Sequence, residues 1–101
     1  MPFVAMNRFR IVPGREDEFI EMWRQRDSHL SGVPGFIEFH LLRGPTTDAH
    51  TLFASHTAWA SRAHFEDWTR SDAFRAAHAG AGHKRDLYLG PPQLELFDAI
   101  V

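Results

Sequence analysis

The sequence predicts an α+β fold: a four-stranded antiparallel sheet with helices on one face, in the ferredoxin-like arrangement. Strands are expected where apolar residues alternate along short segments, at 3–12, 36–43, 51–59 and 94–101. Helices are expected where apolar residues recur at helical spacing, at 15–30, 61–70 and 72–79. The order strand, helix, strand, strand, helix, strand, with the second helix broken once, is that of the ferredoxin-like fold.

The first strand and the first helix each present one apolar face. The core-facing row of the strand at 3–12 consists of Phe3, Ala5, Phe9 and Ile11. Asn7 falls in the same row and is the polar residue of an apolar series. Pro13-Gly14 ends the strand. The helix predicted over 15–30 has acidic residues in its first turn, where the helix dipole favours them, and an apolar stripe of Phe19, Met22, Trp23 and Leu30.

The remaining strands are bounded by turn residues. Residues 36–43 and 51–59 are predicted to pair as a hairpin around the Gly- and Pro-containing turn at 44–48. Residues 81–92 are predicted to form a loop that leads to the last strand at 94–101. The antiparallel sheet is therefore expected to contain all four strands.

Two serines are suited to cap the later helices. Ser61 precedes a predicted helix that runs to about Arg70 and buries Phe65 and Trp68, which are three positions apart. Ser71 precedes a second, short helix over 72–79. Its end is predicted from Gly80 and Gly82.

The length predicts one domain, 1–101, and the uncovered face of its sheet predicts a homodimer. A chain of 101 residues holds one modest core. Helices on one face of the sheet leave the apolar members of the other face uncovered. A second sheet packed face to face is the natural cover, and the prediction is therefore a dimeric α+β barrel.

The composition excludes several classes of function. A formal net charge of -2 provides no broad basic field for nucleic acid or an anionic membrane. Because cysteine is absent, the chain has no disulfide, thiolate metal site or cysteine nucleophile. We expect no signal peptide and no membrane span, because no segment reaches the roughly 20 apolar residues that a span requires. A cytoplasmic location is therefore expected.

His78 and Trp68 are the first two candidates for chemistry. His78 lies near the end of a short helix among alanines, whose small side chains allow a flat macrocycle to approach. A neutral imidazole there can ligate iron and leave the opposite axial position open; a histidine in that turn also complements the helix dipole. Trp68 is either an aromatic wall of a pocket or a core residue packed on Phe65.

Asn7 is the third candidate and the most informative single residue. Burying an unpaired amide costs about 1–3 kcal/mol. The apolar row around Asn7 offers no obvious partner. Its amide therefore either donates a hydrogen bond to a ligand in the cleft between sheet and helices, or bonds backbone or a neighbour such as Thr57.

Five segments give the chain a family resemblance that extends over almost its whole length. They are Asn7-Arg8-Phe9, Val33-Pro34-Gly35-Phe36, Leu41-Leu42-Arg43, Thr57-Ala58-Trp59-Ala60-Ser61, and the stretch from Phe65-Glu66-Asp67-Trp68 to Ala77-His78. In this order they resemble the Isd-type haem-degrading monooxygenases of the antibiotic-biosynthesis-monooxygenase (ABM) superfamily. The last stretch is the most specific, because tryptophan and histidine keep the spacing of the family.

The resemblance implies a role for each candidate. His78 matches the axial ligand of the haem iron, Asn7 the polar residue on the oxygen side, and Trp68 the ring that forces the haem out of plane. Haem is then both substrate and cofactor, with O2 and an external electron donor. Because the chain has no flavin or nicotinamide motif, electrons are expected from a separate reductase or a small-molecule reductant. Trp23 suits a substrate-binding aromatic and equally a core residue.

Other interpretations accompany this one. The same cleft suits a cofactor-independent monooxygenase of an aromatic or quinol substrate within the same superfamily. A non-catalytic haem-binding dimer is the third reading. Arg24 and Arg26 are suited to meet haem propionates, but a solvated helix face is the expected place for both.

Overall fold

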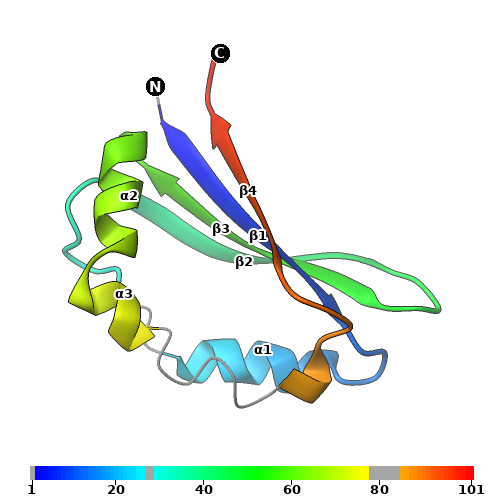
Figure 1. Cartoon of the computed structure of the whole chain (residues 1–101). Coiled ribbons are helices and arrows are strands. Elements are labelled where there is room, and N and C mark those ends of the chain that lie inside the picture. Colours follow the sequence, from blue (N-terminus) through cyan, green and yellow to red (C-terminus); the bar gives the residue numbers. More distant parts are fainter. Residues whose placement is uncertain (1, 27–28, 78–84) are drawn as a thin grey trace.

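The computed structural model describes residues 2–26, 29–77 and 85–101 and confirms the predicted fold (Figure 1). The antiparallel sheet has the order β2-β3-β1-β4, and its strands are β1 Phe3–Ile11, β2 Phe36–Thr46, β3 Thr51–Trp59 and β4 Gln93–Asp98. The helices are α1 Glu16–Gln25, α2 Arg62–Thr69, α3 Asp72–Ala77 and the 3-10 helix η1 Arg85–Leu87. The helices lie on one side of the sheet (Figure 1).

The core consists of two clusters on the helix-facing side of the sheet. The first contains Phe9, Ile11, Phe19, Phe53 and Leu87. The second contains Phe3, Ala5, Leu30, Trp59, Phe65 and Trp68. The core-facing residues predicted on β1 are therefore buried, but they belong to different clusters: Phe3 and Ala5 to the second, and Phe9 and Ile11 to the first. Asn7 lies between these two pairs.

The first helix is shorter than predicted. It ends at Gln25, and Arg26 has an extended backbone with ψ 129°. Leu30, placed by the sequence on the helical stripe, is instead buried in the second core cluster, whereas Phe19 belongs to the first. The stripe was a correct guide to burial, but tertiary packing overrides helical propensity after Gln25.

The hairpin turn is also displaced from its predicted position. Strand β2 continues through Gly44 and Pro45 to Thr46, and the turn closes where the amide of Thr47 donates to the carbonyl of His50. Proline is tolerated because β2 is an edge strand, where a missing ladder donor faces solvent. The pairing is irregular between Arg43 and Thr46.

The predicted loop at 81–92 contains local structure in its described part. Helix η1 places Leu87 in the first core cluster, and Tyr88 bridges to Ile11. The last strand begins one residue earlier than predicted and ends at Asp98 rather than Val101. Neither η1 nor the bridge has an alternating pattern, so periodicity does not predict them.

The opposite face of the sheet is covered by no element in the described ranges (Figure 1). Strand alternation and register assign to it the apolar residues Val4, Met6, Leu42, Leu52, Ala54, Ala58 and Phe97. Among them Leu42 and Phe97 are exposed. Within the same described part, no helix has the length and apolar character that a membrane crossing requires.

Candidate functional site

An apolar cavity of about 170 Å³ lies between the sheet and the helices. Strand residues form one wall: Ala5, Asn7, Phe39, Ser55, Thr57 and Leu94. Helical and connecting residues form the other: Trp23, Arg26, Leu30, Phe65, Trp68, Thr69, Phe74 and Ala77. Three predicted site residues, Asn7, Trp68 and Trp23, therefore line one cavity.

The cavity exists where small and polar side chains interrupt the core. Asn7 pairs across β1 and β3 with Ser55, and across β1 and β4 with Leu94. These side chains share a sheet face, because residues opposite each other on neighbouring strands point the same way. The Asn7 row separates the two core clusters. Leu94 is 58% exposed, so the cavity is bordered by an open edge at β4.

The Oδ1 atom of Asn7 is buried and has no hydrogen-bond partner within the described ranges. Thr57, the protein partner considered from the sequence, instead donates its hydroxyl to the carbonyl of Ala5. Rotation of the amide by 180° exchanges Oδ1 for Nδ2, so the same position can present an acceptor or a donor. Asn7 therefore combines a place in the cavity wall with a buried polar atom that is unsatisfied within the described ranges.

Replacement of Asn7 by leucine is expected to raise the free energy of unfolding by about 1 kcal/mol, because it removes an unsatisfied buried amide. The matched control is Thr57→Val on the same sheet face, which removes a satisfied hydroxyl and should lower that free energy. Urea denaturation measures both. Destabilisation by Asn7→Leu would mean that the amide has a structural role.

Trp68 is held firmly in the cavity wall. Its ring packs on Trp59 at 5.4 Å between centroids and edge-on to Phe74 at 4.8 Å. It is 8% exposed. The two interpretations of Trp68 are therefore compatible, because the same ring belongs to a core cluster and lines the cavity.

The short helix α3 borders the cavity through its last described residue. Ser71 begins it as predicted: its hydroxyl oxygen accepts from the amide of Phe74 and donates to the carbonyl of Trp68. Ala77 is buried and lines the cavity. His78 follows Ala77 in sequence and lies outside the described residues.

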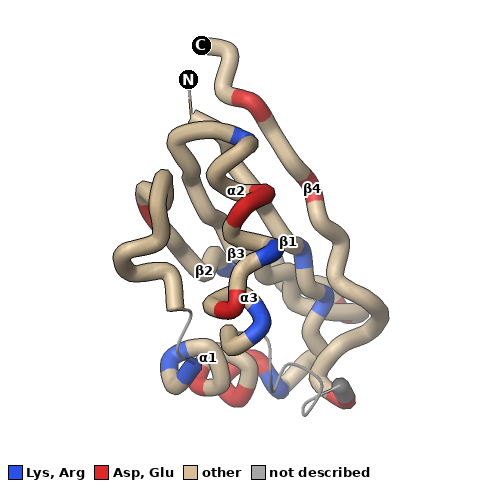
Figure 2. The backbone as a smooth tube through the Cα atoms, turned by 60° about the vertical axis from the view of Figure 1, so that its left-hand side comes forward, with Lys and Arg blue, Asp and Glu red and all other residues tan. Residues whose placement is uncertain are grey.

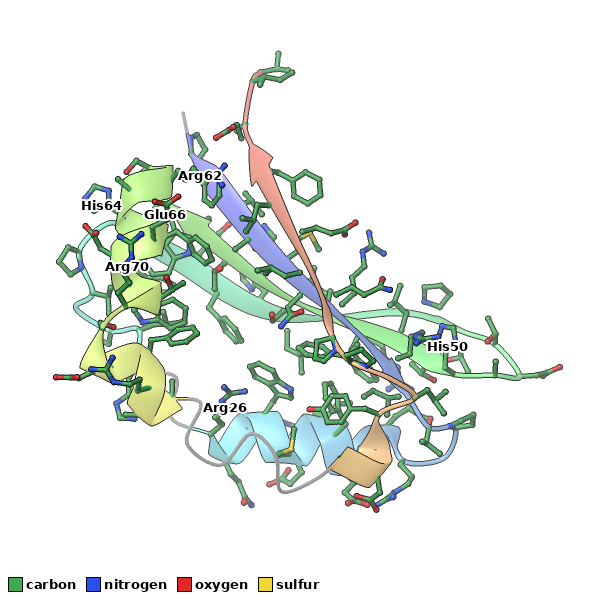
Figure 3. All side chains as sticks on the ribbon, viewed as in Figure 1. Arg26, His50, Arg62, His64, Glu66 and Arg70 are labelled. Atoms are coloured by element: carbon green, nitrogen blue, oxygen red, sulfur yellow. The ribbon has the colours of Figure 1, made fainter. Side chains whose placement is uncertain are left out.

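Arg26 is a site residue that the sequence placed wrongly. It is half-buried in the cavity wall rather than on a solvated face, and its side chain points into the space between the helices and the sheet (Figure 3). Its Nε donates to the carbonyl of Ala77 at 2.9 Å, and its guanidinium lies 4.5 Å from the ring centre of Trp23. No carboxylate within the described ranges forms an ion pair with it.

Burial changes the titration of Arg26 and of Tyr88 near it. Desolvation lowers the pKa of Arg26 below its usual value, and it raises the pKa of Tyr88, an effect that the charge of Arg26 partly opposes. At neutral pH Arg26 is charged and Tyr88 is a neutral phenol. The cavity thus has a cation in its wall, while Figure 2 shows acidic and basic segments interspersed along α1, α2 and α3.

The fold and the cavity define a class: a small ferredoxin-like α+β domain with an apolar cavity between sheet and helices. The chain belongs to the antibiotic biosynthesis monooxygenase family, whose model matches residues 2–80. This family is one of oxygenase-type enzymes.

Individual relatives agree with this assignment. The chain is 31% identical over 88 residues to heme oxygenase (staphylobilin-producing) 1 of Staphylococcus aureus (strain Newman), covering 85% of this chain and 79% of that protein. The chain also resembles the heme-degrader MhuD from Mycobacterium tuberculosis, whose structure has two hemes bound in its active site. The sequences are 27% identical, the TM-score is 0.71, and the match covers 98% of this chain and 96% of that one. SnoaB, a cofactor-independent oxygenase from Streptomyces nogalater, has the same fold, with 23% sequence identity and a TM-score of 0.71. The match covers 99% of this chain and 94% of that one.

Proposed function

We propose that this chain binds haem as both substrate and cofactor and opens the porphyrin ring with O2 and electrons from an external donor. The observation that carries the proposal is an apolar cavity with an unsatisfied amide, Asn7, and a cation without a carboxylate partner in the described ranges, Arg26. The haem-degrading relatives support the choice of substrate.

The described residues fit the chemistry of haem. The apolar wall suits the macrocycle, and the guanidinium of Arg26 suits a propionate carboxylate, which would compensate its half-buried charge. The amide of Asn7 would supply a hydrogen bond to a polar group of the bound ligand. When bound, haem supplies the iron that activates oxygen. The protein's part is to bind, orient and limit the access of water.

The proposal assigns the iron ligand to His78 and a shaping role to Trp68. The assignment of His78 is supported by Ala77, the residue before it in sequence, which lines the cavity. The side chain of Trp68 has little room to change its position, because the rings of Trp59 and Phe74 pack on it. The indole would then be a fixed wall of the site against which a planar ligand packs.

The size of the cavity favours a second candidate substrate. Its volume of about 170 Å³ is below the roughly 300–1,000 Å³ of ordinary ligand pockets. A small aromatic or quinol substrate, oxygenated without a cofactor, would need less rearrangement. Haem requires the macrocycle to extend through the open edge at Leu94 or the wall to move.

Titration with haemin tests the proposed function. We expect a shifted Soret band that saturates at about one haem per chain, and binding at least about tenfold weaker in Arg26→Met, which loses the charge but keeps a long apolar side chain. Arg70→Met removes the charge of an arginine that is 73% exposed and does not line the cavity; it is the matched control and should bind like the wild type. Absence of any Soret shift in the wild type would favour the aromatic substrate instead.

We also propose that the chain functions as a homodimer, the prediction made from the sequence. A second copy packed sheet to sheet would cover the face that contains Leu42, Phe97 and the half-buried Val4 and Met6. Light scattering, which gives the mass in solution, tests this proposal.

A further inference from the structure

A second hollow lies beside the cavity and shares two residues with it. This outer groove has a volume of about 360 Å³ and is lined by Ile20, Trp23, Arg24, Phe39, Leu41, Arg43 and Phe53. Trp23 and Phe39 also line the inner cavity. Their rings are stacked, with centroids 5.7 Å apart and planes inclined by 23°. The two rings are therefore a partition between the cavity and the groove.

The Trp23 ring of the partition is held by ring and cation contacts and not by a hydrogen bond within the described residues. The Nε1 atom of Trp23 is buried and has no hydrogen-bond partner in the described part of the chain. Its ring is held by Phe39, by the cation of Arg26, and by looser contacts with Phe9 and Phe19. A rotation of the indole thus breaks no hydrogen bond, in contrast to a tryptophan anchored through its N–H.

The groove beyond the partition suits the acidic end of a ligand. Arg24 and Arg43 flank an otherwise apolar surface. Arg43 lies over the Phe53 ring at 5.6 Å, and the described residues provide no carboxylate partner for it. The side chain of Arg24 is 73% exposed and 3.6 Å from a carboxylate of Glu21. An anionic group leaving the inner cavity would meet these guanidinium groups.

We infer that Trp23 is the residue that determines ligand size: with its ring closed on Phe39 the site accepts a small planar anion, and with the ring displaced it accepts a large planar carboxylate that spans cavity and groove. Combined, the two spaces of about 170 and 360 Å³ reach the usual range of roughly 300–1,000 Å³ for ligand pockets. The inference rests on the proposed function for its large ligand, haem.

The experiment compares Trp23→Ala with the wild type in binding two probes, haemin and the small planar anion anthraquinone-2-sulfonate. We expect the dissociation constant for haemin to fall about tenfold, because no ring must be displaced, and that for anthraquinone-2-sulfonate to rise about tenfold, because a wall is lost. Met22→Ala, a large-to-small change of a half-buried residue on the same helix, is the control and should change neither constant by as much.

Changes of opposite sign in the two dissociation constants would indicate a partition, because general destabilisation of the protein weakens the binding of both probes. If only Trp23→Ala binds haemin, the partition is supported and haem is not the native substrate. If the wild type binds haemin and Trp23→Ala binds it equally or less well, the partition is wrong and the haem proposal stands. Failure of both probes to bind either protein contradicts the inference.

Discussion

Replacement of His78 by alanine is expected to abolish haem turnover, by more than about 100-fold, while the protein stays folded. An iron ligand contributes to affinity and to the electronic state of the metal, and even the residues that support such ligands change affinity or activity by about 10–100-fold. Ala77 at the end of α3 is buried and lines the cavity, and His78 follows it in sequence outside the described residues. Aerobic decay of the Soret band with a reductant measures the rate.

His50→Ala is the matched control for this substitution. His50 lies at the hairpin turn, at the end of the sheet away from α2 and α3 (Figure 3), and it does not line the cavity. Turnover by this variant should equal that of the wild type. An unchanged rate in His78→Ala would remove the assignment of the iron ligand and leave Asn7 and Arg26 as the site.

Phe19→Ala is expected to have the largest effect on stability, a loss of about 3–5 kcal/mol in the free energy of unfolding. Phe19 is 0% exposed and its ring lies 4.8 Å from Phe53 and 5.6 Å from Phe9. It joins α1 to two strands, so its loss leaves a cavity that backbone elements cannot readily fill. Urea denaturation gives the value.

The exposed Leu89 provides the comparison. It is 44% exposed, and Leu89→Ala should change the same free energy by no more than about 0.5 kcal/mol. Similar losses for both variants would show that α1 is not fixed to the sheet through Phe19. The cavity would then lack the rigid wall that the proposed function requires.

The fold was predictable because strand and helix periods are strong local signals. Phe3, Ala5, Phe9 and Ile11 alternate and are buried as expected. The end of α1 at Gln25 was not predictable, since the apolar stripe continues to Leu30 and only packing in the second core cluster shows that the chain leaves the helix. Periodicity records which residues are buried, but not whether the backbone between them is regular.

The site was predictable where one residue contradicts its surroundings. Asn7 stands in an apolar row; it lines the cavity, and its Oδ1 atom is buried without a hydrogen-bond partner in the described ranges. Arg26 gives no such signal, because arginine at the end of a helix is ordinarily solvated. Its burial depends on the carbonyl of Ala77, which is distant in sequence. The role of His78 stays a prediction, since it lies outside the described residues.

The most direct test of the proposed function is an aerobic absorption spectrum of the haem-reconstituted protein after addition of ascorbate or a reductase, followed by mass analysis of the pigment. Ring opening predicts loss of the Soret band, release of iron and a linear tetrapyrrole carrying added oxygen. A Soret band that persists in air, with intact haem recovered by mass, would contradict it and leave only a haem-binding protein.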